Sequence, residues 1–216
     1  MATSSKKKLP DLPAFAAEIR ELLNQQADLP PVESWNPERE GEIDILINRN
    51  GEWLYQGEPM VRQAVVQLLS SILRKDGDDY FLVTPQEKLK ISVEDVPFIV
   101  QMMDVENAQQ SASATQQRIH FSTQVGECFT LSPEHSLKVV YNERNEPAPY
   151  VHVRAGLYAR LSRSVYYELV DLLDELDSTL PETSLVRPEK AVGSHLEQSA
   201  QMQKMGVWSG GKFFIF

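Results

Sequence analysis

One short segment of this chain occurs twice, and the two copies constrain the fold more than any other feature. Residues 81–91 read FLVTPQEKLKI, and residues 129–139 read FTLSPEHSLKV. Both copies place a hydroxyl residue before proline and continue with Leu-Lys and an aliphatic residue. Two short apolar runs around a proline turn are typical of a β-hairpin. The repeat therefore predicts two related units, each with such a hairpin, and a seam where the units meet.

Local patterns around the repeat predict an α+β architecture. Asn50-Gly51 is a strong hairpin turn between a β-branched strand at 43–47 and a strand at 53–55. A wide apolar stripe from Met60 to Leu73 predicts a buried helix, and a second stripe predicts a helix over 165–176. We therefore expect a duplicated two-domain protein in which each unit is a curved antiparallel sheet packed on one helix.

Both ends of the chain add elements to these units. Apolar residues at helical spacing predict an N-terminal helix from Asp11 that ends before Pro30. The aromatic tail, Gly206–Phe216, is expected to pack on the body as a Gly-Gly hairpin. The predicted divisions are an N-terminal helix and linker over 1–40, a first unit over 41–105, a polar loop over 106–118, a second unit over 119–181 and a C-terminal extension over 182–216.

Composition limits the classes of function. The net charge of −10 argues against general affinity for nucleic acid or for anionic membranes. No apolar run approaches the roughly 20 residues that a membrane helix needs. One cysteine, Cys128, cannot form an internal disulfide, and the start of the chain lacks the apolar core of a signal peptide. We therefore expect a cytoplasmic protein that has no nucleic-acid or membrane partner.

The sequence contains no strong catalytic or metal-binding motif. Its four histidines lie on separate segments without the spacing of a zinc site. Gly206-Val-Trp-Ser-Gly210 is not a nucleophile elbow, and Gly210-Gly211-Lys212 lacks the rest of a phosphate loop. No catalytic residue, metal ligand or cofactor is assigned on these grounds.

The first candidate ligand-binding cluster joins Trp53 and Tyr55 to Arg62, near the start of the helix from Met60. The positive helix end and the Arg62 guanidinium would hold an anion, beside an aromatic face that stacks on a ring. The alternative is structural: both aromatic side chains belong to the core, and Arg62 pairs with Glu58 or another acid.

The second candidate cluster is rich in cationic side chains and surrounds a predicted turn at Ala155-Gly156. Its members, which the turn would bring onto one strand face, are His152, Arg154, Tyr158 and Arg160. Arginine suits bidentate capture of phosphate or carboxylate. The alternative is an exposed sheet face whose arginines balance an acidic helix at 171–177. Thr84 and Ser132, each just before a proline, are further candidates because they could supply hydroxyl groups.

Three ordered motifs resemble a bacterial family catalogued as domain of unknown function 1285. They read G-x-W-x-x-x-G-x-P-M-x-R over 51–62, L-V-T-P-x-E-K over 82–88 and V-E-D-x-P-F over 93–98. Met60 departs from the isoleucine expected there, and its thioether would fill the same space. The resemblance implies a duplicated two-domain fold and a C-terminal unit superficially like pleckstrin-homology folds. It also implies a nucleotide-like ligand between the domains and a role in signalling.

Three hypotheses follow for the function. The leading one is a non-catalytic ligand-binding protein that holds a small anionic, nucleotide-like ligand at the seam and takes part in signal transduction. The second is a protein–protein interaction module that uses the acidic surface and the aromatic tail. The third, an enzyme acting on phosphates, is the least favoured, because no base–nucleophile pair or metal set can be assembled.

Overall fold

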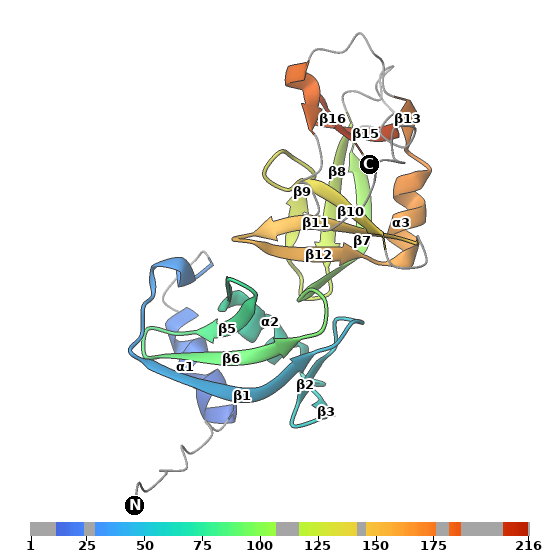
Figure 1. The fold of residues 1–216 in the computed structure, drawn as a ribbon. Helices are drawn as coiled ribbons and strands as arrows, with labels where there is room; N and C mark the ends of the chain where they lie inside the picture. The colour runs from blue at the N-terminus through green and yellow to red at the C-terminus, as the bar shows by residue number, and fades with distance from the viewer. Residues whose placement is uncertain are drawn as a thin grey trace, which may run out of the picture. The chain divides into compact units, whose positions relative to one another are not determined.

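The computed structural model describes residues 12–23, 29–106, 117–141, 146–175, 182–186 and 205–215 (Figure 1). The chain divides into two compact units, Met1–Asp95 and Val96–Phe216. Most of the predicted polar loop at 106–118 and of the extension after 186 lies outside the described residues.

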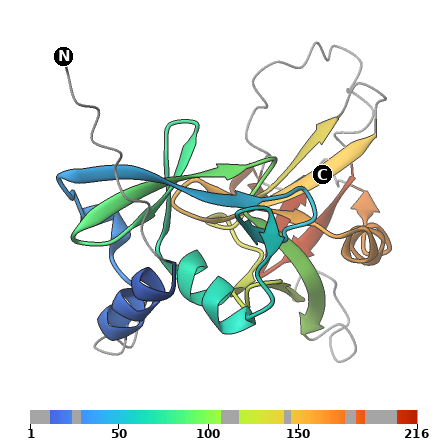
Figure 2. The same ribbon diagram turned by 90° about the horizontal axis from the view of Figure 1, so that it is seen from below.

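The first unit is a six-stranded sheet in the order β3-β2-β1-β6-β5-β4. Neighbouring strands are antiparallel except for the parallel pair of β1 and β6. Its elements are α1 (Leu12–Leu23), η1 (Val32–Ser34), β1 (Arg39–Ile47), β2 (Trp53–Tyr55), β3 (Glu58–Pro59), α2 (Gln63–Ser71), β4 (Leu73–Asp76), β5 (Asp79–Val83) and β6 (Glu87–Val93). Helices α1 and α2 contact each other and lie on the same face of this sheet (Figure 2).

The residue pattern of β1 explains its central place in the sheet. Ile43, Ile45 and Ile47 alternate along the strand, and each is at most 4% exposed. Their β-branched side chains pack well on a pleated surface, so one face of β1 enters the core. The predicted turn at Asn50-Gly51 joins β1 to β2, and Gly51 takes the positive φ of 77° that glycine tolerates.

Helix α2 is shorter than the helix predicted from Met60 to Leu73. It buries Leu69 as expected, but it also buries Val66, which lay outside the predicted stripe, and it ends at Ser71. Leu73 instead pairs with Leu82 as the first residue of β4. An apolar stripe cannot distinguish the last turn of a buried helix from the start of a buried strand, which is why the sequence overestimated the helix.

The second unit is a six-stranded sheet in the order β10-β11-β12-β7-β8-β9. Its elements are β7 (Phe98–Glu106), β8 (Arg118–Thr123), β9 (Cys128–Thr130), β10 (Leu137–Tyr141), β11 (Pro147–Arg154), β12 (Leu157–Leu161) and α3 (Arg163–Val170). Strand β7 hydrogen-bonds to β8 and β12 and so belongs to the second unit. The sequence had assigned most of this strand to the first unit, which was predicted to end at residue 105. Ser162 caps α3, because its Oγ accepts a hydrogen bond from the Val165 amide.

The two sheets have the same topology. Adding six to each strand number of the first sheet gives the order β9-β8-β7-β12-β11-β10, which is the order of the second sheet read from its other edge. The pairing directions also agree, including the single parallel pair, which is β1 with β6 in one unit and β7 with β12 in the other. The predicted duplication is therefore confirmed.

The strand equivalence implied by the sequence repeat is wrong. The first copy of the repeat is the predicted hairpin, in which β5 pairs with β6. The second copy covers β9 and β10, which lie at opposite edges of their sheet and form no hairpin. Topology matches the hairpin of β5 and β6 to that of β11 and β12. Short apolar runs around a proline specify a turn, but the strand that each run joins depends on residues far along the chain.

A third, smaller sheet contains the aromatic tail. It has the order β13-β15-β16-β14, from β13 (Asp174–Glu175), β14 (Leu185–Val186), β15 (Met205–Ser209) and β16 (Lys212–Ile215), with η3 (Glu182–Ser184) before β14. The predicted Gly-Gly hairpin is confirmed, since Ser209 pairs with Lys212 across Gly210 and Gly211. The Ser209 hydroxyl accepts a hydrogen bond from the Ile119 amide and donates one to the Leu131 carbonyl. The tail therefore packs on its own chain.

Candidate functional site

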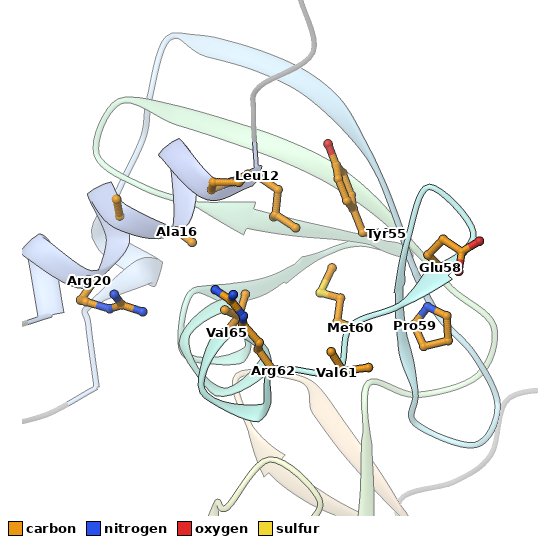
Figure 3. A pocket seen from close by; sticks show the side chains of 12 residues that line it. Leu12, Ala16, Arg20, Tyr55, Glu58, Pro59, Met60, Val61, Arg62 and Val65 are labelled. Atoms are coloured by element: carbon orange, nitrogen blue, oxygen red, sulfur yellow. The ribbon is translucent and has the colours of Figure 1, made fainter.

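A pocket of about 410 Å³ opens in the first unit between α1 and the segment that enters α2 (Figure 3). Every residue from Glu58 to Arg62 lines it, and α1 forms the other wall. Its volume lies within the range of roughly 300–1,000 Å³ that is typical of small-molecule sites.

The turn between β2 and β3 places the first wall of this pocket. Gln56 and Gly57 both take positive φ, 52° and 81°, and this tight turn returns the chain alongside β2. Pro59 lacks an N–H and so fits the edge strand β3. The Met60 amide then donates to the Trp53 carbonyl at 2.8 Å, which holds the segment against β2 until α2 begins.

Most of the lining is apolar. Leu12 and Ala16 of α1 lie across the pocket from Met60 and Val61 (Figure 3), and Pro13 and Ala17 of the same helix also line it. Val61 is 91% exposed, so its side chain presents apolar surface that a bound molecule would cover. These walls favour a ligand with an apolar body.

Two arginines provide positive charge at one end of the pocket. Arg20 and Arg62 both line it, and in Figure 3 their guanidinium groups extend toward one another. Arg62 is also the residue before the first turn of α2, so the positive end of that helix lies nearby. Tyr55 and Glu58 lie toward the opposite end (Figure 3). The pocket is therefore polarised along its length, with positive charge at one end and a carboxylate and a phenol group toward the other.

The structure divides the first predicted cluster. Tyr55 and Arg62 both line the pocket. Trp53 is 3% exposed and lies in the core, where its indole nitrogen has no hydrogen-bond partner among the described residues. Trp53 therefore fits the structural alternative, whereas Tyr55 and Arg62 have side chains that line a pocket.

The structure brings three members of the second predicted cluster onto one sheet face. His152 of β11 pairs across the strands with Tyr158 of β12, and Arg160 of β12 pairs with Tyr150 in the same register. A register shift between His152 and Arg154 pairs Arg154 with the buried Leu157 instead, and the Arg154 guanidinium lies 5.7 Å from the ring centre of the buried Phe98. Ala155 and Gly156 form the predicted turn, with φ of 43° and 73°.

The polar groups of this cluster already contact other groups in the unit. The His152 Nδ1 lies 2.7 Å from the Glu134 carbonyl oxygen, and its Nε2 accepts from the Gly156 amide. Arg154 forms an ion pair with Glu127 at 3.1 Å. The His152 ring continues a row of ring contacts made by Phe129, His135, His152 and Tyr158, with the Lys138 ammonium 3.5 Å from the Tyr158 ring centre. These contacts agree with the alternative of a partly exposed sheet face.

Thr84 and Ser132 stabilise their own turns. Thr84 is fully buried, and its hydroxyl accepts from the amides of Gln86 and Glu87. The Ser132 hydroxyl donates to the Glu134 carboxylate at 2.8 Å. This hydrogen bond is the main reason why the pKa of Glu134 lies below its usual value.

The sequence did not lead us to predict that residues of α1 line a pocket. Leu12, Ala16 and Arg20 recur every four residues and so share one helix face beside the buried Phe15 and Ile19. The spacing was visible in the sequence, but the partner of that face was not. Across the described ranges, no cluster of three metal-ligating side chains and no helix fit to cross a membrane is present.

Fold and pocket together define a duplicated α+β protein with a polarised pocket in its first unit. The chain belongs to the DUF1285 family: the N-terminal domain model of this domain of unknown function matches residues 30–96, and the C-terminal domain model matches residues 97–191. The resemblance seen in the sequence is thereby confirmed. The border between the two models coincides to within one residue with the division between the structural units.

A solved structure supports the same assignment. A DUF1285 family protein from Silicibacter pomeroyi DSS-3 is 33% identical, with a TM-score of 0.74 over 97% of this chain and 96% of that one. A DUF1285 family protein from Shewanella baltica OS155 is 29% identical, with a TM-score of 0.44 over 59% of this chain and 90% of that one. No curated protein matches the chain.

Proposed function

We propose that this protein is a non-catalytic, cytoplasmic ligand-binding protein that holds a small anionic ligand in the pocket of its first unit. The observation that carries the proposal is the pair of arginines, Arg20 and Arg62, at one end of an otherwise apolar pocket. Guanidinium groups bind carboxylate or phosphate through two parallel hydrogen bonds, and the nearby start of α2 adds a favourable dipole.

Binding, rather than catalysis, is the activity that this pocket supports. Among the described residues that line it, the charged side chains are two arginines and one glutamate, and the remaining polar side chain is Tyr55. This set neutralises and orients an anion, and it contains no serine, cysteine or histidine for nucleophilic attack. A sensor whose output depends on occupancy is consistent with such a site, and that role in signalling is part of the proposal.

Two other expectations from the sequence concern regions outside this pocket. A ligand at the seam between the units stays a prediction, and the second cluster of His152, Arg154, Tyr158 and Arg160 is no part of the pocket proposed above. The alternative of a partner bound by the aromatic tail also stays a prediction. Phe213 and Phe214 are buried against the tail's own chain, so partner binding through them would require the hairpin to detach.

The test is a thermal-shift screen of the full chain against nucleotides, phosphorylated metabolites and carboxylates. A ligand at a hundredfold excess over its Kd adds about 2.7 kcal/mol of stability, which raises the Tm by several degrees. We expect Arg20→Ala and Arg62→Ala each to weaken binding of the hit about tenfold, a loss of roughly 1.4 kcal/mol for one partly exposed charged hydrogen bond.

Arg39→Ala is the matched control. Arg39 belongs to the same unit, its side chain is 76% exposed, and it does not line the pocket. Its removal should leave the Kd unchanged. Wild-type affinity in both pocket variants would refute the proposed site.

A further inference from the structure

The order of chemical groups along the pocket restricts the class of ligand. Arg20 and Arg62 occupy one end, Tyr55 and Glu58 lie toward the other, and the walls between them come from Leu12, Ala16, Met60 and Val61 (Figure 3). Between the ends, the lining side chains carry no hydrogen-bond donor or acceptor. A molecule that matches this order has an anion at one end and an aliphatic body.

We infer that the ligand is a medium-chain aliphatic carboxylate, an inference that rests on the proposed function. Its carboxylate would meet the guanidinium groups of Arg20 and Arg62, while its methylene groups would cover Val61 and contact Met60. Val61 is 91% exposed, so a chain laid over it removes apolar surface from water. The unbranched thioether of Met60 adapts to chains of different shape.

A nucleotide fits this pocket less well. Its base edges and ribose hydroxyls would lie in the middle of the pocket, where the lining side chains offer no partner. Polar groups that lose water without gaining a hydrogen bond oppose binding. The anion end alone would remain favourable for such a ligand.

The test is calorimetric titration of the full chain with saturated monocarboxylates of about four to twelve carbons, a range chosen for a pocket of this size. We expect the affinity to rise about fourfold with each added methylene until the chain fills the pocket, and then to level off. Primary alcohols of equal length should bind about tenfold more weakly, because they lack the charge that the arginines recognise.

Two variants locate the binding. Val61→Asp places a charge on the wall and should abolish the dependence on chain length, and its exposed position keeps the fold intact. Met102→Asp is the matched control, because Met102 is 68% exposed on β7 in the second unit. It should bind every carboxylate as the wild type does.

Other results of these titrations would overturn the inference, the proposed function or both. Binding of adenosine monophosphate that depends on Arg20 and Arg62, without dependence on chain length among carboxylates, would overturn the inference and leave the proposed function standing. Failure of every anion to bind would overturn both. Dependence on chain length that survives Val61→Asp would place the apolar contact elsewhere and overturn the inference.

Discussion

Arg74 is a charged side chain placed inside the first unit. It is 7% exposed, and its Nη1 donates to the backbone carbonyls of Val32 and Trp35 at 2.9 and 2.7 Å. Its Nε and Nη2 donate to the two carboxylate oxygens of Asp76 at 2.9 and 2.8 Å. One guanidinium group thereby fixes the linker before β1 to strand β4.

We predict that Arg74→Met lowers the free energy of unfolding by about 3 kcal/mol, because two carbonyls and a carboxylate lose their charged partner. Urea unfolding followed by circular dichroism measures this loss. Arg39→Met is the control: that side chain is 76% exposed and 3.8 Å from Glu87, so its loss should be within experimental error. Equal effects of the two substitutions would contradict the structural role of Arg74.

The ionisation of Asp76 makes the stability that this arrangement contributes depend on pH. Partial burial by itself would raise the pKa of Asp76, but hydrogen bonds and charge from Arg74 and Lys88 outweigh it and hold the pKa below the ordinary 3.8. The Lys88 ammonium lies 3.0 Å from the carboxylate. A lowered pKa in the folded state means that the ionised form stabilises the fold above the unfolded pKa, and that this contribution is lost as the pH falls through the folded value.

We therefore predict that the stability advantage of the wild type over Asp76→Asn is largest near neutral pH. It should begin to shrink as the pH falls below about 4, where Asp76 of the unfolded chain takes up a proton, and it should be lost as the pH falls through the lower pKa of the folded state. Urea unfolding of both proteins across this range checks the prediction. A difference that stays constant with pH would show that Asp76 acts through its shape and not its charge.

The β15–β16 hairpin is an element whose attachment depends on one glycine. A Cβ atom on Gly206 would lie 2.4 Å from the Phe214 carbonyl oxygen and 2.6 Å from the Phe213 ring. Both phenylalanines are buried, so neither can move away without opening the hairpin.

We predict that Gly206→Ala destabilises the second unit by about 1–3 kcal/mol through overpacking. Amide hydrogen exchange should become faster at Ile119, whose N–H donates to Ser209 of this hairpin. Gly41→Ala is the comparison, because its added methyl group would meet only the flexible Leu89 side chain at 3.2 Å. Unchanged exchange at Ile119 in Gly206→Ala would contradict this account of the hairpin.

At the scale of the whole molecule, each unit contains all the strand pairs of its own six-stranded sheet. In each unit the first and last strands of the sheet, β1 with β6 or β7 with β12, pair in parallel and join its two halves. Among the described residues, those that line the pocket likewise lie between Leu12 and Val65. The sheet of the first unit therefore takes no strand from the second.

We predict that a fragment of residues 1–96 folds and binds the same ligand as the full chain with a Kd within about threefold. Dispersed amide signals in a two-dimensional NMR spectrum would report folding, and calorimetry would report the Kd. A folded fragment that binds more than about tenfold more weakly would show that the site needs the second unit, as the seam hypothesis predicts.

Local features of the fold followed from the sequence alone. The turn at Asn50-Gly51, the hairpin around Pro85 and the Gly-Gly hairpin of the tail were all predicted and are present. Each depends on the conformational preferences of a few adjacent residues, and those preferences act in the same way in any fold.

Tertiary structure alone decided how these local elements combine. The second copy of the repeat forms two opposite edge strands, and Thr84, predicted to supply a ligand hydroxyl, is buried in its own turn. Arg20 and Arg62 share a pocket only because α1 packs beside α2. A residue's neighbours along the chain set its turn or helix, whereas its burial and its ligand contacts are set by segments tens of residues away that the folded core brings together.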